Sequence, residues 1–173
     1  MSTGQIPLYD AAGARAIDAC AIDELGVPGI DLMRAAAAAA DRVVRGRFPH
    51  ARRVLVAAGS GNNGGDGHEV ARLLAASGRD VRIVRIAGRP AEGDAATTLA
   101  DATAAGVPVH EGPLDALLDD ADLVIDALLG TGATGAPTGA VADAIAAIRE
   151  SGVPVVALDV PSGVDASTGE APG

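Results

Sequence analysis

The chain has no lysine, no tryptophan and almost no other aromatic residue, and these absences exclude several kinds of chemistry. All 13 of its basic residues are arginines, so it can form neither a Schiff base nor a Walker-A phosphate loop, which both need lysine. Its one cysteine, Cys20, cannot form an internal disulfide and is too little sulfur for a thiolate zinc cluster. Tyr9 and Phe48 are the only aromatic residues, so base-stacking platforms and aromatic cages are excluded as well.

Positive charge is also scarce, since 23 acidic residues outnumber the 13 arginines and give the chain a formal net charge of −10 at pH 7. Such a chain repels phosphate backbones, so general nucleic-acid binding is not expected. Residues 1–10 have no basic region followed by an apolar run, and no apolar stretch reaches membrane-spanning length without a charge or a glycine. We therefore expect a cytoplasmic protein that has no signal peptide and does not bind a membrane.

What the chain does have is an alternation of short β-branched runs and longer runs of alanine and leucine. Apolar residues make up 49% of it, which is enough for a core of alanine, valine, leucine and isoleucine. The alternation is typical of βαβ units, so we expect a mainly parallel sheet covered by helices. Expected helices span 9–24, 30–46, 66–77, 92–105 and 139–150, and expected strands span 54–58, 81–86, 107–109, 123–125 and 155–158. Pro108 favours an edge position for the strand that contains it.

Three polar loops follow three of the expected strands. They read GSGNNGGDG at 59–67, DALLGTGATGAP at 126–137 and DVPSGVD at 159–165. In open α/β sheets, ligands bind outside the carboxyl ends of the strands. One shared pocket therefore explains these loops more simply than three unrelated turns. Their amide, hydroxyl and carboxylate oxygens suit a hard cation better than zinc, which prefers nitrogen and sulfur ligands.

Simpler interpretations of individual segments remain open. Asp126 can cap the turn that follows it, and the acidic residues between 115 and 122 predict only a solvated face. The loop 59–67 contains G-x-G-x-x-G, but that pattern alone is a weak signal. The full dinucleotide fingerprint also needs an acid after the next strand, and strand 81–86 is followed by Ala-Gly-Arg. An ordinary NAD-dependent oxidoreductase is therefore not favoured.

Taken together, the three loops resemble the motifs of the YjeF N-terminal domain family. The matching segments are GNNGGDG at 61–67, DALLGTG at 126–132 and DVPSGVD at 159–165, in this order along the chain. The leading region is similar as well, with LGVPG at 25–29 and Leu32-Met33 before an alanine-rich run. The resemblance covers nearly the whole chain.

This resemblance implies a Rossmann-like three-layer α/β/α sandwich and the activity of an NAD(P)H-hydrate epimerase, an isomerase of metabolite repair. Such enzymes interconvert the R and S epimers at C6 of hydrated NADH and NADPH, which are called NADHX and NADPHX. A partner dehydratase that uses ADP or ATP then repairs the product, and it can be fused to the epimerase in one longer chain. The resemblance is also compatible with a homodimer.

Individual residues receive roles from the same resemblance. Asp159 is the expected catalytic residue and also contacts the substrate. A potassium ion is the expected cofactor, with Asn63, Asp126 and Ser162 as its ligands. The other expected substrate contacts are Asn62, Asn63, Gly64, Gly65, Asp66, Gly130, Thr131, Gly132, Ala133, Thr134, Gly135 and Ala136. As a hypothesis, Asp159 protonates the departing hydroxyl and then accepts a proton from the water that returns on the other face.

We expect one domain over residues 1–173, with leading helices in 1–50 and a Rossmann-like core in 51–173. Family domains run some dozens of residues further than the position of Gly173, so this core is expected to lack its last elements. An alternative from another class is a non-catalytic nucleotide-binding or scaffold module of the same family type. The presence of Asp159 and of all three expected cation ligands favours the enzyme, because a scaffold does not need them.

Overall fold

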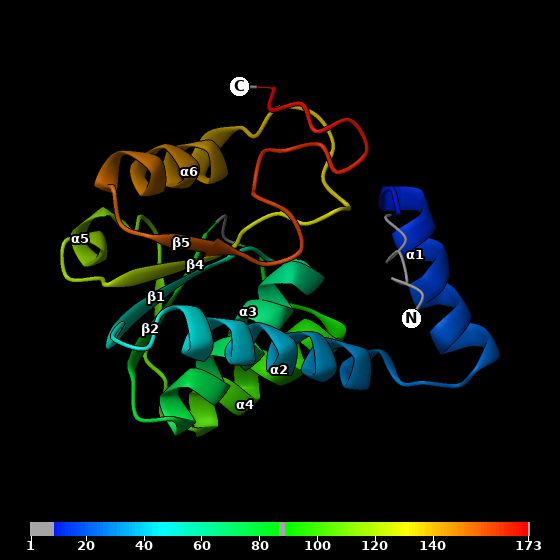
Figure 1. Ribbon diagram of the computed structural model, residues 1–173, viewed down its shortest axis with the longest axis horizontal. Helices are drawn as coiled ribbons and strands as arrows, with labels where there is room; N and C mark the ends of the chain where they lie inside the picture. Colours follow the sequence, from blue (N-terminus) through cyan, green and yellow to red (C-terminus); the bar gives the residue numbers. More distant parts are fainter. Residues whose placement is uncertain (1–8, 87–88, 173) are drawn as a thin grey trace, which may run out of the picture.

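The computed structural model describes residues 9–86 and 89–172, and its elements follow the alternation expected from the sequence (Figure 1). The helices are α1 (Ala11–Ala19), the π-helical turn η1 (Cys20–Glu24), α2 (Gly29–Arg47), α3 (Asn62–Ala76), α4 (Gly93–Ala104), α5 (Asp115–Leu118) and α6 (Gly139–Ser151). The strands are β1 (Arg53–Ala58), β2 (Asp80–Arg85), β3 (Val109–Glu111), β4 (Leu123–Ala127) and β5 (Val155–Ala157). Within the described residues, no helix combines the length and the apolar character needed to cross a membrane.

The five strands form one parallel sheet in the order β3-β2-β1-β4-β5. From β1 the chain passes to β2 and β3 on one side, and it then returns to β4 and β5 on the other side. The direction in which successive strands are added therefore reverses between β1 and β4. Val54 of β1 is in register with Val81 of β2 on one side and with Leu123 of β4 on the other. Such a reversal is the place where open α/β sheets bind ligands. The expected edge position of the third strand is confirmed, although this strand begins two residues later than predicted.

Helices cover both faces of this sheet, which confirms the expected α/β fold (Figure 1). Successive strand residues point to opposite faces, because the side chains of a strand alternate. Val56 packs in one buried cluster with Leu74 of α3, and α2 and α4 contribute to the same cluster. Leu55 packs in a second cluster with Ile148 of α6 and with residues around α5. The sheet is thus the middle layer, and its carboxyl edge remains available for a site.

Helix α3 begins at Asn62, four residues before the predicted start at residue 66. Glycine is a poor helix former, so the glycines between residues 59 and 67 predicted a loop there. The structure shows that these glycines meet a packing requirement. A Cβ on Gly64 would overlap the Gly59 carbonyl oxygen, and a Cβ on Gly67 would lie 2.6 Å from the Cβ of Ala127. The first turns of α3 therefore lie directly against the ends of β1 and β4.

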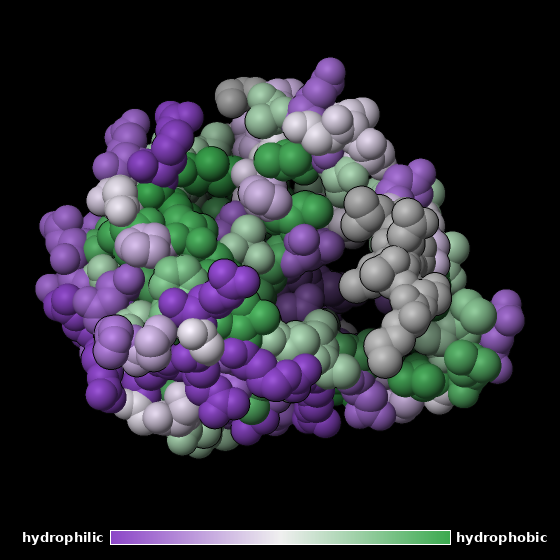
Figure 2. Space-filling model, viewed as in Figure 1, coloured by the Kyte–Doolittle hydropathy of each residue, from purple (hydrophilic) through white to green (hydrophobic). Residues whose placement is uncertain are grey.

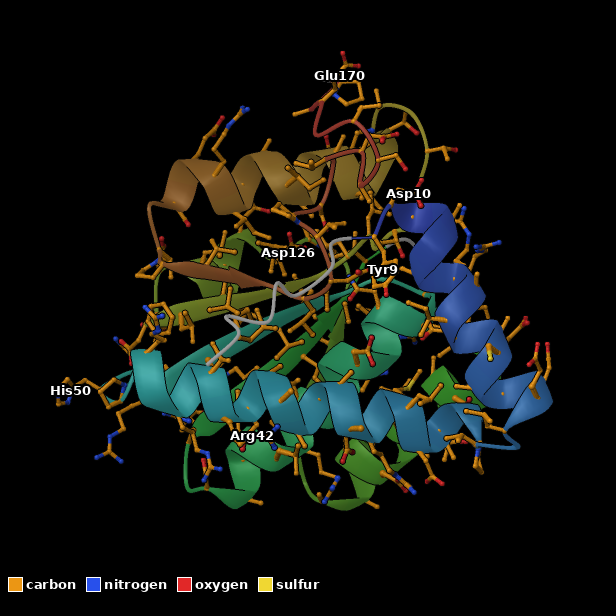
Figure 3. The ribbon with its side chains drawn as sticks, turned by 45° about the vertical axis from the view of Figure 1, so that its right-hand side comes forward. Tyr9, Asp10, Arg42, His50, Asp126 and Glu170 are labelled. Atoms are coloured by element: carbon orange, nitrogen blue, oxygen red, sulfur yellow. The ribbon has the colours of Figure 1, made fainter. Side chains whose placement is uncertain are left out.

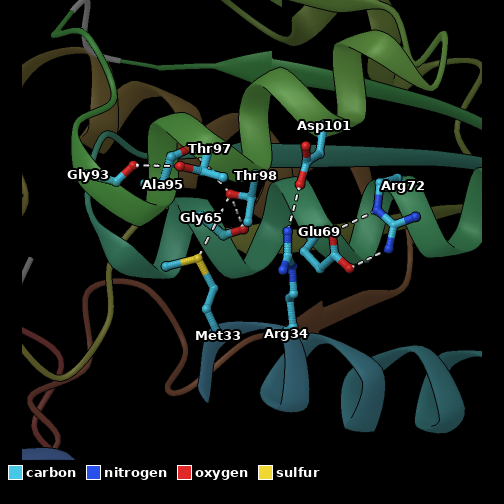
Figure 4. Close-up of polar contacts among 10 residues, drawn as sticks. All are labelled: Met33, Arg34, Gly65, Glu69, Arg72, Gly93, Ala95, Thr97, Thr98 and Asp101. Atoms are coloured by element: carbon cyan, nitrogen blue, oxygen red, sulfur yellow. Dashed lines mark hydrogen bonds and ion pairs between the residues drawn. The ribbon is translucent and has the colours of Figure 1, made fainter. Parts of the chain in front are cut away.

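The outer side of α3 packs against α2 and α4 through small and polar groups (Figure 4). The Thr98 hydroxyl of α4 donates to the Gly65 carbonyl at 3.0 Å, and a Cβ on Gly65 would lie 2.7 Å from the Met33 methyl of α2. His68 is fully buried on this side, with Nδ1 3.3 Å from the Ala95 carbonyl oxygen. Burial lowers the pKa of His68 to about 4, so the ring is neutral at pH 7.

The acidic segment between 115 and 122 departs in part from the predicted solvated face. It contains the short helix α5, which the sequence did not indicate, and Asp115, Asp119 and Asp120 are exposed as expected. Asp122 is different, because its carboxylate accepts hydrogen bonds from the backbone N–H groups of Arg52 and Arg53, each at 2.9 Å. It therefore joins the beginnings of β1 and β4.

The packing of α3 predicts that Gly64→Ala lowers the free energy of unfolding by about 2 kcal/mol, because the added methyl group forces the helix away from the end of β1. Gly46→Ala, on a part of α2 with open space around it, is the matched control and should raise stability by up to about 1 kcal/mol. Urea unfolding followed by circular dichroism measures both values. A Gly64→Ala variant as stable as the unchanged chain would contradict the close contact.

Candidate functional site

A cavity of about 950 Å³ opens at the carboxyl edge of the sheet, beside the switch point between β1 and β4. Residues that follow β1, β2, β4 and β5 line it, together with residues of α1, α2 and the start of α3. In Figure 2 the surface is hollowed between the body of the molecule and the side that carries α1, and hydrophilic residues are visible inside. The volume is at the upper end of the range for small-molecule sites, so a large ligand fits.

Helix α1 forms one wall of this cavity (Figures 1 and 3). Its N-terminus is capped by Asp10, whose carboxylate accepts a hydrogen bond from the Gly13 backbone N–H at 2.7 Å. Arg15 of α1 donates to the Thr131 carbonyl oxygen at 3.1 Å. Ala14 and Asp18 of the same helix also line the cavity. The leading helix therefore contributes charged groups to the site as well as covering it.

Asp159 follows β5 and lies in the cavity with an unusual backbone. Its φ is 62°, and among the described residues it is the single non-glycine residue with a positive φ. Left-handed backbone is unfavourable for residues with a side chain, and such strain is concentrated at functional sites. Asp159 Oδ2 accepts a hydrogen bond from the Thr131 backbone N–H at 2.6 Å. A Cβ on Gly130 would lie 2.6 Å from the same oxygen, so glycine is required for this close approach.

Asp66 is a second carboxyl group that lines the cavity, in addition to Asp159. It lies in the first turns of α3, where burial raises its pKa to about 7. The negative charges of Asp159 and Asp18 act in the same direction, because each disfavours a further negative charge nearby. Burial therefore favours the protonated form of Asp66 well above the pH at which an ordinary aspartate releases its proton.

Behind the cavity, a buried polar cluster ties the loops after β1, β4 and β5 together. The Ser162 hydroxyl donates to Asp126 Oδ1 at 2.5 Å, and the Ser162 backbone N–H donates to Asp126 Oδ2 at 2.9 Å. The Leu129 backbone N–H donates to the Ser162 hydroxyl at 2.9 Å. Asn63 donates through Nδ2 to the Leu129 carbonyl oxygen at 2.8 Å. These contacts bring together the three expected cation ligands, Asn63, Asp126 and Ser162, within one network.

The donor set of this cluster fits a cation. Asn63 Oδ1 is buried, and it has no hydrogen-bond partner among the residues that the structure describes. A buried oxygen without a partner is unfavourable, and a bound cation would remove that cost. The other candidate donors are oxygens, and only Asp126 carries a negative charge. Across the described residues, no group of three or more His, Cys, Asp or Glu side chains is placed to hold a metal.

The structure places most of the expected substrate contacts in the cavity. Those that line it are Asn62, Asn63, Asp66, Gly130, Thr131, Gly132, Ala133 and Asp159. Gly64 and Gly65 lie outside its lining, since they are buried in the contacts of α3. Thr134, Gly135 and Ala136 continue the same loop beyond the lining residues.

Sequence reasoning missed the part of the lining that other segments supply. Arg15 and Asp18 come from α1, and Arg89 follows β2. Nothing in a helical pattern shows that α1 reaches a loop 116 residues further along the chain. Arg89 did carry a signal, because it stands where a dinucleotide-binding fold normally has an acid.

The raised pKa of Asp66 predicts that Asp66→Asn stabilises the chain more at pH 8 than at pH 5. Between its ordinary value of 3.8 and about 7, folded Asp66 keeps a proton that the unfolded chain has released, so stability falls as the pH rises through this window. Asparagine does not titrate, so the advantage of the variant should grow by roughly 2 kcal/mol between the two pH values. Urea unfolding at both pH values measures this growth. An advantage that is equal at pH 5 and pH 8 would show that Asp66 is not desolvated.

Comparison with known proteins places this geometry in a family. The family model described as YjeF-related protein N-terminus matches residues 29–173. An NAD(P)H-hydrate epimerase of Limosilactobacillus fermentum is 41% identical over 160 residues, which are 92% of this chain and 76% of that protein. The bifunctional NAD(P)H-hydrate repair enzyme Nnr of Escherichia coli is 40% identical over 154 residues, which are 88% of this chain and 30% of that enzyme.

A solved structure supports the same fold. The crystal structure of the yeast protein ynu0 matches with a TM-score of 0.84 at 24% identity, covering 92% of this chain and 72% of that one. The family model spans most of the chain, and the alignment with the relative from Limosilactobacillus fermentum covers most of both proteins. The chain therefore belongs to the family of YjeF-related protein N-termini.

Proposed function

We propose that the cavity binds hydrated NADH or NADPH and that Asp159 epimerises the C6 carbon of the reduced nicotinamide ring. The class of reaction follows from the comparisons, because the relatives at about 40% identity carry the name NAD(P)H-hydrate epimerase. The chain is accordingly an NAD(P)H-hydrate epimerase, an isomerase. One observation supports the role of Asp159 above others: its strained backbone holds a carboxyl group at the end of β5 within the cavity.

Epimerisation at C6 requires one bond to break and to form again. Asp159 takes up the proton that Asp66 can hold and donates it to the C6 hydroxyl, the C6–O bond breaks and water leaves. The electron pair of the ring nitrogen forms a C6=N bond, so the positive charge resides on an iminium. Water then adds to C6 from the opposite face and returns a proton to the Asp159 carboxylate. Acid–base assistance of this kind is worth about 10²–10⁴-fold in rate.

The surroundings of Asp159 support this chemistry. The Thr131 backbone N–H fixes the orientation of the carboxyl group, so its position does not depend on the substrate. Asp66 lies close enough for the two charges to interact, and its pKa of about 7 allows it to hold a proton at neutral pH. Two carboxyl groups with unequal surroundings supply both an acid and a base in one cavity. A non-catalytic module has no need of such a pair.

Potassium is the cofactor that we propose for the cluster of Asn63, Asp126 and Ser162. Its donors are the Asn63 amide oxygen, which no described residue contacts by a hydrogen bond, a hydroxyl, a carboxylate and the Leu129 carbonyl, all of them oxygens. One negative charge among neutral oxygens suits a large monovalent cation better than a divalent one. When bound, the ion would supply positive charge that holds the loops after β1, β4 and β5 in place. Asn63 also lines the cavity, so the cluster positions the substrate site directly.

The product of this reaction needs a second enzyme. Epimerisation does not remove the added water, so a dehydratase that uses ADP or ATP is the proposed functional partner. The Escherichia coli relative is named bifunctional, and this chain aligns with 30% of its length. We propose that the chain supplies the S epimer to such a dehydratase in the repair of NADHX and NADPHX.

Asp159→Asn is expected to lower the rate of R-to-S conversion at least about 100-fold, because a carboxamide cannot act as the acid. The assay incubates R-NADHX with the protein and an S-specific dehydratase and follows the consumption of the R epimer above its spontaneous rate. Asp143→Asn, on the exposed side of α6, changes the charge equally and should leave the rate unchanged. A near-normal rate in the Asp159 variant would remove Asp159 from the mechanism.

The proposed cation predicts a specific salt effect on stability. Replacing sodium chloride by potassium chloride at constant ionic strength should raise the melting temperature by several degrees, since an ion that binds only the folded chain stabilises it. Ser162→Ala should remove most of that rise, whereas Ser167→Ala, at an exposed position of the same segment, should keep it. Equal melting temperatures in both salts would argue against a potassium site.

A further inference from the structure

Among the described residues that line the cavity, acidic side chains outnumber basic ones, and the basic ones are arginines. Of the lining residues that the structure describes, Asp18, Asp66 and Asp159 are acidic, and Arg15 and Arg89 are basic. Arg15 is engaged by the Thr131 carbonyl, beside Asp159. Arg89 has no side-chain hydrogen bond or ion pair with any residue that the structure describes. Since none of the described residues engages its side chain, Arg89 is available to a ligand in the cavity.

Arg89 and Asp159 line the same cavity from segments that follow different strands. Asp159 follows β5, and Arg89 comes from the segment after β2, so β1 and β4 lie between them in the sheet. Neighbouring strands are about 4.8 Å apart, which separates the two strand ends by roughly 14 Å. Gly59, Ser60 and the start of α3 line the cavity between them. A substrate with its reacting ring at Asp159 therefore extends past the start of α3 toward Arg89.

The chain holds the backbone of Arg89 in place. Arg85, the last residue of β2, donates through Nη2 to the Arg89 carbonyl oxygen at 2.8 Å. Its other terminal nitrogen, Nη1, pairs with Glu111 of β3 at 2.5 Å. Glu111 is therefore neutralised by Arg85, and Arg89 is left for the cavity. Ile86, between Arg85 and Arg89, lines the cavity as well.

In doubly wound folds, the residue type that follows the second strand determines which form of a dinucleotide is bound. When a dinucleotide crosses the switch point with its diphosphate at the first helix after β1, its adenosine ribose reaches the end of the second strand. An acid there accepts a hydrogen bond from the ribose 2′-hydroxyl, and an arginine accommodates a 2′-phosphate. Glu92, the next acid along the chain, stands at the start of α4 and outside the lining.

We propose that Arg89 binds the 2′-phosphate of hydrated NADPH and makes this chain prefer NADPHX to NADHX. The guanidinium offers a planar set of N–H donors that matches phosphate oxygens. The loss of such a contact costs about 10- to 100-fold in affinity. This inference rests on the proposed function, because it takes the epimerisation substrate as the occupant of the cavity.

Kinetics with both substrates test the proposal. For the unchanged chain, kcat/KM for R-NADPHX should exceed that for R-NADHX by about 10-fold or more. Arg89→Gln should lower kcat/KM for R-NADPHX by about 10- to 100-fold, mainly through KM, and should change the value for R-NADHX less than about 2-fold. Arg149→Gln, on an exposed part of α6, removes the same charge and should change neither value. An equal loss with both substrates would assign Arg89 to the diphosphate and overturn the proposal, as would no loss at all.

A binding measurement separates this proposal from the proposed function. Adenosine 2′,5′-bisphosphate and adenosine 5′-monophosphate differ by the 2′-phosphate, and neither can react at a nicotinamide. Calorimetry should show tighter binding of the bisphosphate to the unchanged chain and equal binding of both probes to Arg89→Gln. If the chain binds the bisphosphate selectively but epimerises neither substrate, only the proposed function fails. If it epimerises both but binds the two probes equally, only the role of Arg89 fails.

Discussion

The site depends on the close approach of backbone segments at the carboxyl edge of the sheet. A Cβ on Gly59 would overlap the Leu128 carbonyl oxygen, and a Cβ on Gly64 would overlap the Gly59 carbonyl oxygen. Gly130 in turn lies against both Asp159 and Asn63. These glycines allow the loops after β1, β4 and β5 to meet without side chains between them. The close packing brings into one cavity polar groups that are far apart in the sequence.

That closeness also determines the electrostatics of the cavity. Asp66 is carried inward by the first turns of α3, and burial together with the charges of Asp159 and Asp18 raises its pKa to about 7. Asp126 is buried too, but it accepts hydrogen bonds from the Ser162 hydroxyl and the Ser162 backbone N–H. The two carboxyl groups therefore differ in what surrounds them. Burial favours a proton on Asp66, whereas Asp126 joins the loops after β4 and β5 through its hydrogen bonds with Ser162.

The sequence predicted the sheet and the meeting of its loops, because buried parallel strands read as short apolar runs and end along one edge. It could not predict that α3 begins at Asn62, since glycine propensity opposes a helix and only tertiary contacts favour one there. The contact of Arg15 with Thr131 joins residues 116 positions apart, and no local pattern encodes it. The left-handed backbone of Asp159 and the burial of the Asn63 amide oxygen likewise depend on the folded chain. The resemblance named Asp159 and Asn63 as expected site residues, but it did not name Arg15.

The central claim is that the carboxyl group held at the end of β5 removes the C6 hydroxyl as water and admits water to the opposite face. The most direct test is the epimerisation of R-NADPHX in water enriched in oxygen-18, with mass spectrometry of the S epimer as it forms. The account predicts that each S epimer produced above the spontaneous rate carries one oxygen from the solvent at C6. An S epimer that forms at the enzymatic rate but keeps the original oxygen would contradict it.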